Sequence, residues 1–100
     1  MVNDVLLSAN KAFLGQNFSD ARAIYEQCFP SNVKELANTL MGKPILKHVF
    51  RNYLYSLAFE GDIDKIERLM YEYKAADPHD TIVTSTKGLP TLDSHQETPR

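Results

Sequence analysis

The sequence predicts an all-α fold with about five helices, and three observations lead to this prediction. Apolar residues recur at spacings of three and four along most of the chain up to Ala76, as in helices with one buried face. Glycine and proline residues interrupt the pattern where helices would end or begin. No segment shows the sustained alternation of apolar and polar residues that is typical of a half-buried strand.

The first two expected helices lie before Pro30. The first ends at Gly15, because a residue without a side chain suits the left-handed position that terminates a helix. Its apolar stripe comprises Val5, Leu6, Ala9, Ala12 and Phe13. The second begins after Ser19, a good N-terminal cap, and is stopped by Pro30. Its apolar face comprises Ala21, Ile24, Tyr25 and Cys28.

A third, shorter helix is expected between Ser31, a second candidate cap, and Gly42. Its apolar residues are Val33, Leu36, Ala37 and Leu40. Pro44 suits the first position of a fourth helix, since its missing N–H would have no partner there. This helix, from Pro44 to Phe59, carries the longest stripe, formed by Leu46, Val49, Phe50, Tyr53, Leu54 and Leu57.

Gly61 permits a sharp turn after the fourth helix, and Asp62 is expected to cap a fifth. The fifth helix presents an answering stripe formed by Ile63, Ile66, Leu69, Met70 and Tyr73. Helices joined by such short loops pack as antiparallel neighbours. The last two helices are therefore predicted to form a hairpin.

The domain is expected to span residues 1–78, followed by a flexible tail over residues 79–100. After Asp77-Pro78 the sequence is rich in Thr, Ser, Pro and His and has no sustained periodicity. The residues 81–84 could begin a further short element. A domain of this size is near the lower limit for a self-sufficient core, so burial against a partner or a second copy would help it.

Composition excludes several classes of function. The formal net charge of −2 argues against a domain that binds nucleic acid mainly by neutralising phosphates. The single cysteine, Cys28, excludes an internal disulfide and zinc sites of the CxxC type. No apolar run approaches the roughly 20 residues that cross a bilayer, and the N-terminus lacks a basic signal region. We therefore expect no membrane partner and an intracellular, most simply cytoplasmic, location; a mitochondrial location is the alternative, without a clear presequence.

No catalytic residue, metal site or cofactor is predicted, and no small-molecule substrate is evident. The three histidines, at positions 48, 79 and 95, are scattered and have no metal-ligand partner at i+4. The predicted buried position of Cys28 suits packing better than nucleophilic chemistry. The acidic residues after Gly61 alternate with Lys65 and Arg68, as on a solvated helix face.

Two stretches of the sequence echo each other: LLSANKAFLGQNFSDARAIYEQCF and VFRNYLYSLAFEGDIDKIERLMYEY. Each contains an apolar helix, a glycine-containing turn, an apolar residue (Phe18 or Ile63), two polar residues and a second apolar helix. Internal similarity between helix–turn–helix units is the signature of an α-solenoid, in which each unit buries its face on the next. The sequence therefore predicts a short α-solenoid-like array of antiparallel helical hairpins.

The first of these units resembles a tetratricopeptide repeat. Ala9 and Ala21 match small residues that let paired helices approach, and Phe18 matches the aromatic residue after the turn. Gly15 lies one residue early relative to that family. The second unit resembles a pentatricopeptide repeat, following its rhythm of helix, G-x-apolar turn, helix and closing Pro-Asp-like end up to Pro78-His79-Asp80, although an isoleucine replaces the usual alanine in its second helix.

The pentatricopeptide resemblance implies that Asn52 would contact an RNA base. On the same expected helix Lys47, Arg51 and Tyr55 follow at intervals of four, and such residues could hold phosphates and stack on a base. Lys43 lies in the same basic stretch. The alternative is that these residues only form the solvated side of a helix whose other side is buried.

The tetratricopeptide resemblance implies a groove that grips a peptide. Lys47 and Arg51 have a spacing that would clamp a terminal carboxylate, with Asn10 or Lys11 as companions. The small core and the acidic balance favour a protein partner or a larger assembly, with single-stranded RNA as the alternative ligand. Tyr55 or Tyr71 could anchor a partner at the surface.

Overall fold

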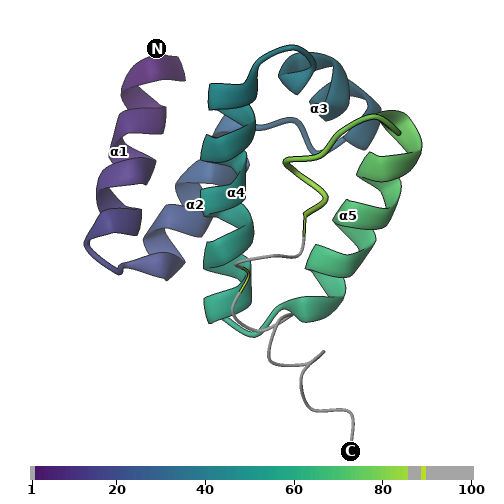
Figure 1. Cartoon of the computed structure of the whole chain (residues 1–100). Helices are drawn as coiled ribbons and strands as arrows, with labels where there is room; N and C mark the ends of the chain where they lie inside the picture. The colour runs from purple at the N-terminus through teal and green to yellow at the C-terminus, as the bar shows by residue number, and fades with distance from the viewer. Residues whose placement is uncertain (1, 86–88, 90–100) are drawn as a thin grey trace, which may run out of the picture.

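Five α-helices form the part of the chain that the computed structural model describes, residues 2–85 and 89 (Figure 1). They are α1 (Val2–Leu14), α2 (Phe18–Cys28), α3 (Val33–Leu40), α4 (Pro44–Phe59) and α5 (Ile63–Ala76). No strand occurs among these residues. The predicted all-α fold with five helices is confirmed. No helix in this part of the chain is both long and apolar enough to cross a membrane.

The helix ends lie within one or two residues of their predicted positions, but the residues that define them differ. Gln16, with φ of 64°, takes the left-handed position that Gly15 was expected to occupy. Asn17 precedes α2 in place of Ser19, and Asn32 precedes α3 in place of Ser31. Asparagine is as good a cap as serine, and the Asn32 side chain accepts a hydrogen bond from a backbone N–H of the first turn.

The two predicted hairpins, α1–α2 and α4–α5, meet at α4. Helices α1 and α2 pack against each other, and α2 also packs against α4. Gly61, with φ of 80°, makes the turn between α4 and α5 as predicted. Helix α3 crosses the end of this second hairpin and contacts both of its helices (Figure 1). The resemblance to the two repeat families stays a prediction.

A single core joins all five helices, and the predicted stripe of α4 lies at its centre. Phe50, Tyr53, Leu54 and Leu57 of this stripe are buried, and Leu46 and Val49 are half-buried. Ile66, Met70 and Tyr73 provide the buried face of α5. Leu36, Ala37 and Leu40 of α3 and Ala21 and Tyr25 of α2 complete the interior.

The chain after α5 belongs to the folded domain, which corrects the predicted boundary at residue 78. Residues 77–85, here called the return segment, leave α5 and enter the opening between α4 and α5 (Figure 1). Val83 and Leu89 are 1% and 0% exposed, and Asp80 is also buried. Val83 and Leu89 form no periodic pattern with their neighbours, which is why this packing is missed. The other residues of the expected tail lie outside the described part.

Candidate functional site

The first residue of the predicted binding ridge, Lys47, is buried by the return segment. Its ammonium lies 2.9 Å from a carboxylate oxygen of Asp80 and 3.3 Å from one of Asp77. The Asp80 carboxylate also accepts hydrogen bonds from the backbone N–H groups of Val83 and Thr84. The prediction that Lys47 faces solvent is wrong, because a segment about 30 residues later in the chain covers this side of α4.

Both members of the shorter ion pair stay charged near neutral pH. Burial opposes ionisation of Asp80, but the N–H groups of Thr84 and Val83 and the Lys47 ammonium outweigh it and lower the pKa of Asp80 to about 2. Burial likewise opposes the charge of Lys47, and Asp80 and Asp77 outweigh it, so the pKa of Lys47 is raised. The pair therefore acts as a buried electrostatic link between α4 and the return segment.

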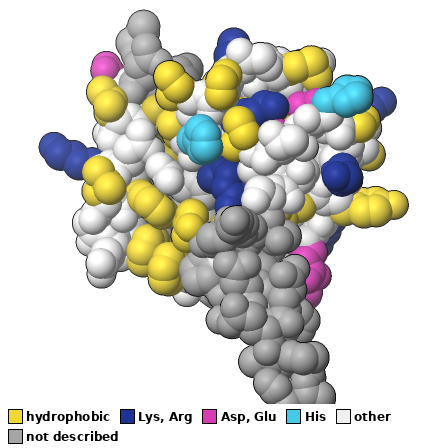
Figure 2. All heavy atoms as spheres, in the orientation of Figure 1, with side chains coloured by type: hydrophobic (Ala, Val, Ile, Leu, Met, Phe, Trp, Pro, Cys, Tyr) yellow, Lys and Arg dark blue, Asp and Glu magenta, His cyan; other side chains and the backbone are white. Residues whose placement is uncertain are grey.

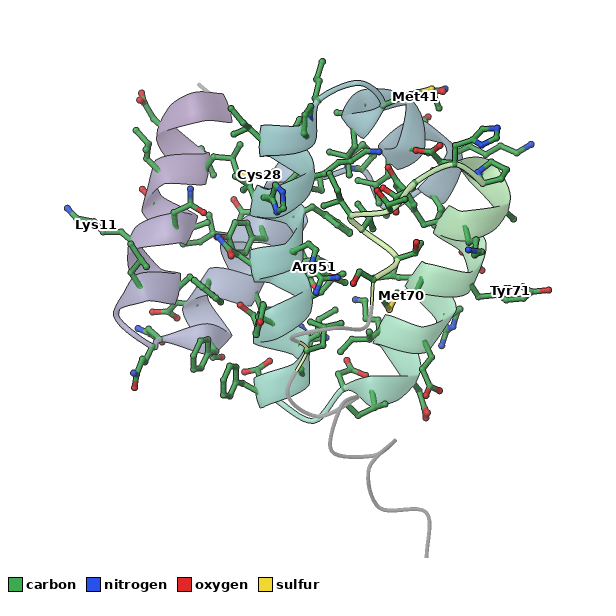
Figure 3. All side chains as sticks on the ribbon, in the orientation of Figure 1. Lys11, Cys28, Met41, Arg51, Met70 and Tyr71 are labelled. Carbon is green, nitrogen blue, oxygen red and sulfur yellow. The ribbon has the colours of Figure 1, made fainter. Side chains whose placement is uncertain are left out.

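Arg51, the second predicted residue, also serves the return segment. It is half-buried, and in Figure 3 it points from α4 toward that segment. Its guanidinium donates hydrogen bonds to the backbone carbonyls of Ile82, at 3.2 Å, Val83, at 3.3 Å, and Ser85. Lys47 and Arg51 are thus brought together, as the sequence suggests, but around a piece of their own chain.

Asn52, Tyr55 and Asn10 are half-buried between α1 and α4. Asn10 accepts a hydrogen bond from the hydroxyl of Tyr25. The rings of Tyr55 and Phe13 meet edge-on, with their centroids 6.1 Å apart. Tyr55, Phe13, Phe18 and Phe59 form an aromatic cluster over the ends of three helices, where hydrophobic side chains gather at the lower left of Figure 2.

Two other predicted site residues and one predicted surface anchor are exposed. Lys11 is exposed and points outward from α1 (Figure 3), and Lys43, just before α4, is exposed. Of the two tyrosines predicted as surface anchors, Tyr71 is 80% exposed and points away from α5. Cys28 is half-buried, and burial raises the pKa of its thiol.

A pocket of about 250 Å³, here called the anchor pocket, lies where the end of α2 meets α3, α4 and α5. Its floor is apolar and buried, formed by Phe29, Leu36, Phe50 and Tyr53. Glu26, Ser31 and Lys65 contribute polar groups. The combination of an apolar floor and a few polar groups is typical of binding sites.

Phe29 lines the pocket because of the proline that follows it. The residue before a proline is disfavoured in the helical region, and Phe29 is extended, with φ of −105° and ψ of 141°. The chain leaves α2 at this point, and the ring of Phe29 meets the ring of Phe50 edge-on, with centroids 5.0 Å apart. The ring centroid of Phe50 lies 5.5 Å from that of Tyr53. These contacts join the aromatic side chains of the pocket floor.

Glu26 is held in place by three donors that all reach its Oε2 atom. They are the hydroxyl of Tyr53 at 2.9 Å, Lys65 Nζ at 3.1 Å and Arg22 Nε at 3.2 Å. Burial opposes ionisation of Glu26, but these donors outweigh it and lower its pKa. The same arrangement raises the pKa of Tyr53 far above its usual value, chiefly by burial and then by the bond to Glu26.

Arg22 fixes the position of α2 relative to the turn between α4 and α5. Besides Glu26, its guanidinium binds Glu60 at 3.1 Å and Asp62 at 2.9 Å. Asp62 occupies the predicted N-cap position of α5, but its carboxylate makes no capping hydrogen bond and accepts one from Arg22 instead. Arg22 therefore links α2, which carries Glu26, to the turn between α4 and α5.

Sequence reasoning missed the anchor pocket because each of its residues has an ordinary explanation by itself. Glu26 and Lys65 read as solvated helix residues, and Phe29 falls outside the stripe of its helix. One feature of the sequence does indicate the pocket. Phe29 directly precedes Pro30, so it is expected to end the helix and to point away from the apolar stripe of α2. The described residues contain no group of three or more His, Cys, Asp or Glu side chains that could hold a metal ion.

No protein-family model, curated protein or solved structure matches this chain. Its function is therefore argued from the two places where its side chains converge, the anchor pocket and the surroundings of Lys47.

Proposed function

We propose that this protein is a helical interaction module, rather than an enzyme, and that its anchor pocket receives one side chain of a protein partner. The observation that carries the proposal is the size and lining of the pocket. About 250 Å³ is below the roughly 300–1,000 Å³ of sites for drug-sized ligands, so a single large side chain fits better than a cofactor. Aromatic anchors buried in such pockets dominate many protein interfaces.

The polar groups of the pocket favour an anchor that carries a hydrogen-bond donor. All three donors to Glu26 use Oε2, which leaves Oε1 for a donor from the partner. The negative end of the α2 dipole lies nearby and also favours a donor. A tryptophan side chain combines an aromatic body with an N–H group, so we propose tryptophan as the anchor.

A peptide selection tests this proposal. A random peptide library selected on the immobilised chain is expected to enrich peptides that contain one tryptophan. For a selected peptide, Glu26→Gln is expected to weaken binding about tenfold, because it removes the charge that accepts the N–H bond. Lys11→Ala is the matched control on an exposed surface and is expected to leave the affinity unchanged.

A second variant fills the pocket. The chain has no tryptophan, so Leu69→Trp introduces one fluorophore on the α5 wall, and a blue-shifted emission reports that the indole is buried in the pocket. This variant is expected to abolish binding of the selected peptide. Unchanged affinity in a folded Leu69→Trp chain would contradict the proposal.

Single-stranded RNA serves as the counter-test. The RNA hypothesis requires Lys47 and Arg51 at the surface, whereas both are engaged with the return segment. A labelled RNA that binds at low salt and dissociates as salt rises would favour RNA over the protein partner.

A further inference from the structure

The return segment lies on α4 and α5 with the kinds of contact that hold a bound peptide. Arg51 binds three backbone carbonyls of the segment, and such contacts do not depend on side-chain identity. Asp80 and Val83, three residues apart, supply the specific contacts, one with Lys47 and one by burial. Main-chain hydrogen bonds combined with spaced side-chain sites are typical of grooves that bind extended peptides.

Asp80 also organises the return segment internally. Its Oδ1 atom accepts from Lys47 and from the N–H of Val83, while Oδ2 accepts from the N–H and the hydroxyl of Thr84. The segment is therefore a turn that Asp80 closes by itself. A peptide that forms this turn before binding loses less conformational freedom when it binds.

The surface under the return segment is suited to an exchange of occupants. Lys47 and Arg51 lie at the edge of the apolar stripe of α4, so opening the segment exposes two charged side chains together with the apolar contacts of Val83. Tyr73 of α5 is 1% exposed, and its hydroxyl lies beside the Asp77 carboxylate without a well-formed hydrogen bond. An unsatisfied buried hydroxyl is unfavourable, so the resident segment leaves one donor that a better occupant would use.

We propose that the surface of α4 and α5 around Lys47, Arg51 and Tyr73 is a peptide-binding site whose resident occupant is the return segment. The site accepts in exchange a partner peptide with an aspartate and, three residues later, an aliphatic residue. This site is independent of the anchor pocket.

The first experiment measures binding of the segment in trans. A fluorescein-labelled peptide of residues 77–85, DPHDTIVTS, is titrated with the full chain, and anisotropy is recorded. The wild-type chain is expected to bind weakly, because its own segment competes. Asp80→Ala in the chain weakens that competitor, so the affinity for the peptide is expected to rise about tenfold.

The specificity controls use the same assay. Lys47→Met added to the Asp80→Ala chain is expected to remove binding, and so is asparagine in place of Asp80 in the peptide. Glu26→Gln is expected to change nothing here, which separates this site from the anchor pocket. Equal affinity of the peptide for the Asp80→Ala chain with and without Lys47 would overturn the proposal.

A second measurement needs no variant and remains decisive if Asp80→Ala fails to fold. In the wild-type chain the amide hydrogens of Val83 and Thr84 are expected to exchange at least about a hundredfold faster than those of the centre of α4, because the segment opens while the helices stay folded. If these amides exchanged at the same rate as the amide of Leu54, the return segment would be a permanent part of the core, and the proposal would be overturned.

Discussion

At the scale of single residues, buried hydroxyls and carboxylates divide into satisfied and unsatisfied groups. The Tyr53 hydroxyl donates to Glu26, whereas the Tyr73 hydroxyl is buried beside the Asp77 carboxylate without a well-formed hydrogen bond. Burial is the main cause that raises the pKa of both, to about 12 for Tyr73. Similar burial thus has opposite consequences for stability, depending on the partner.

Removing the two hydroxyls separately tests this difference. Tyr53→Phe is expected to lower the free energy of unfolding by about 1–2 kcal/mol, since it leaves Glu26 without one donor. Tyr73→Phe keeps the ring and removes the unsatisfied group, so it is expected to be neutral or stabilising by up to about 1 kcal/mol. Urea denaturation of both variants gives the comparison, and equal losses would contradict the assignment.

The Asp80 carboxylate gives a prediction that depends on pH. Because the folded-state pKa is lowered from 3.8 to about 2, its contribution to stability is complete above pH 3.8 and is lost as the pH falls through 2. Asp80→Asn is therefore expected to destabilise the chain by about 2 kcal/mol at pH 7. The difference from wild type should shrink toward zero near pH 2. A difference that does not change with pH would mean that packing, not charge, is responsible.

At the scale of elements, the turns and the braces between helices set the arrangement. Arg22 pairs with Glu26 within α2 and joins α2 to the turn before α5 through Glu60 and Asp62, and all three carboxylates are partly exposed. Each partly exposed ion pair contributes little to stability. Because one arginine makes all three pairs, the conformational entropy of its side chain is lost only once.

Arg22→Ala is expected to lower the free energy of unfolding by about 1–2 kcal/mol in low salt. In 1 M NaCl the effect should fall to less than half, because salt screens exposed charges. Lys11→Ala, on the outer side of α1, is the control and should change stability by less than about 0.5 kcal/mol. A loss that is independent of salt would indicate that the stem of Arg22 acts by packing.

The left-handed residues at the helix ends give an opposed pair of substitutions. Gly61 has φ of 80° and open space where a side chain would lie, so Gly61→Ala is expected to be destabilising by about 1–2 kcal/mol through the backbone alone. Gln16 has φ of 64° without being glycine, so Gln16→Gly is expected to stabilise by up to about 1 kcal/mol. Thermal unfolding measures both, and shifts in the same direction would contradict the reasoning.

The helices and their buried faces were predictable because periodicity is a local signal. The stripe from Leu46 to Leu57 identifies the core side of α4 without knowledge of its neighbours. The same pattern places Lys47 in water, since nothing within α4 reveals a segment that returns to cover it. Val83 and Leu89 form no periodic pattern with their neighbours, and Phe29 lines a pocket only after Pro30 redirects the chain. Contacts distant in the sequence therefore decide the candidate sites.

At the scale of the whole molecule, the buried tyrosines connect ionisation to unfolding. Tyr25, Tyr53 and Tyr73 lie in three different helices, and burial is the first cause that raises each pKa. A raised pKa stabilises the folded state fully below pH 10, and this contribution is lost as the pH rises through the folded-state values.

Alkaline titration is therefore expected to show these three tyrosines ionising in one cooperative step above the usual tyrosine pKa of about 10, together with loss of helical circular dichroism. Absorbance at 295 nm follows the tyrosinates. Tyr53→Phe should reduce the amplitude of this step by about one third. Ionisation of all three before any loss of helix would show that the tyrosines are accessible in the folded chain.

The link between Lys47 and Asp80 joins residues 33 positions apart, and this separation has a consequence during protein synthesis. At roughly 5–20 residues per second, the ribosome adds Asp80 a few seconds after Lys47. Throughout that interval α4 has no return segment to cover its charged side. The ion pair between α4 and the return segment therefore forms only after α4 itself has been synthesised.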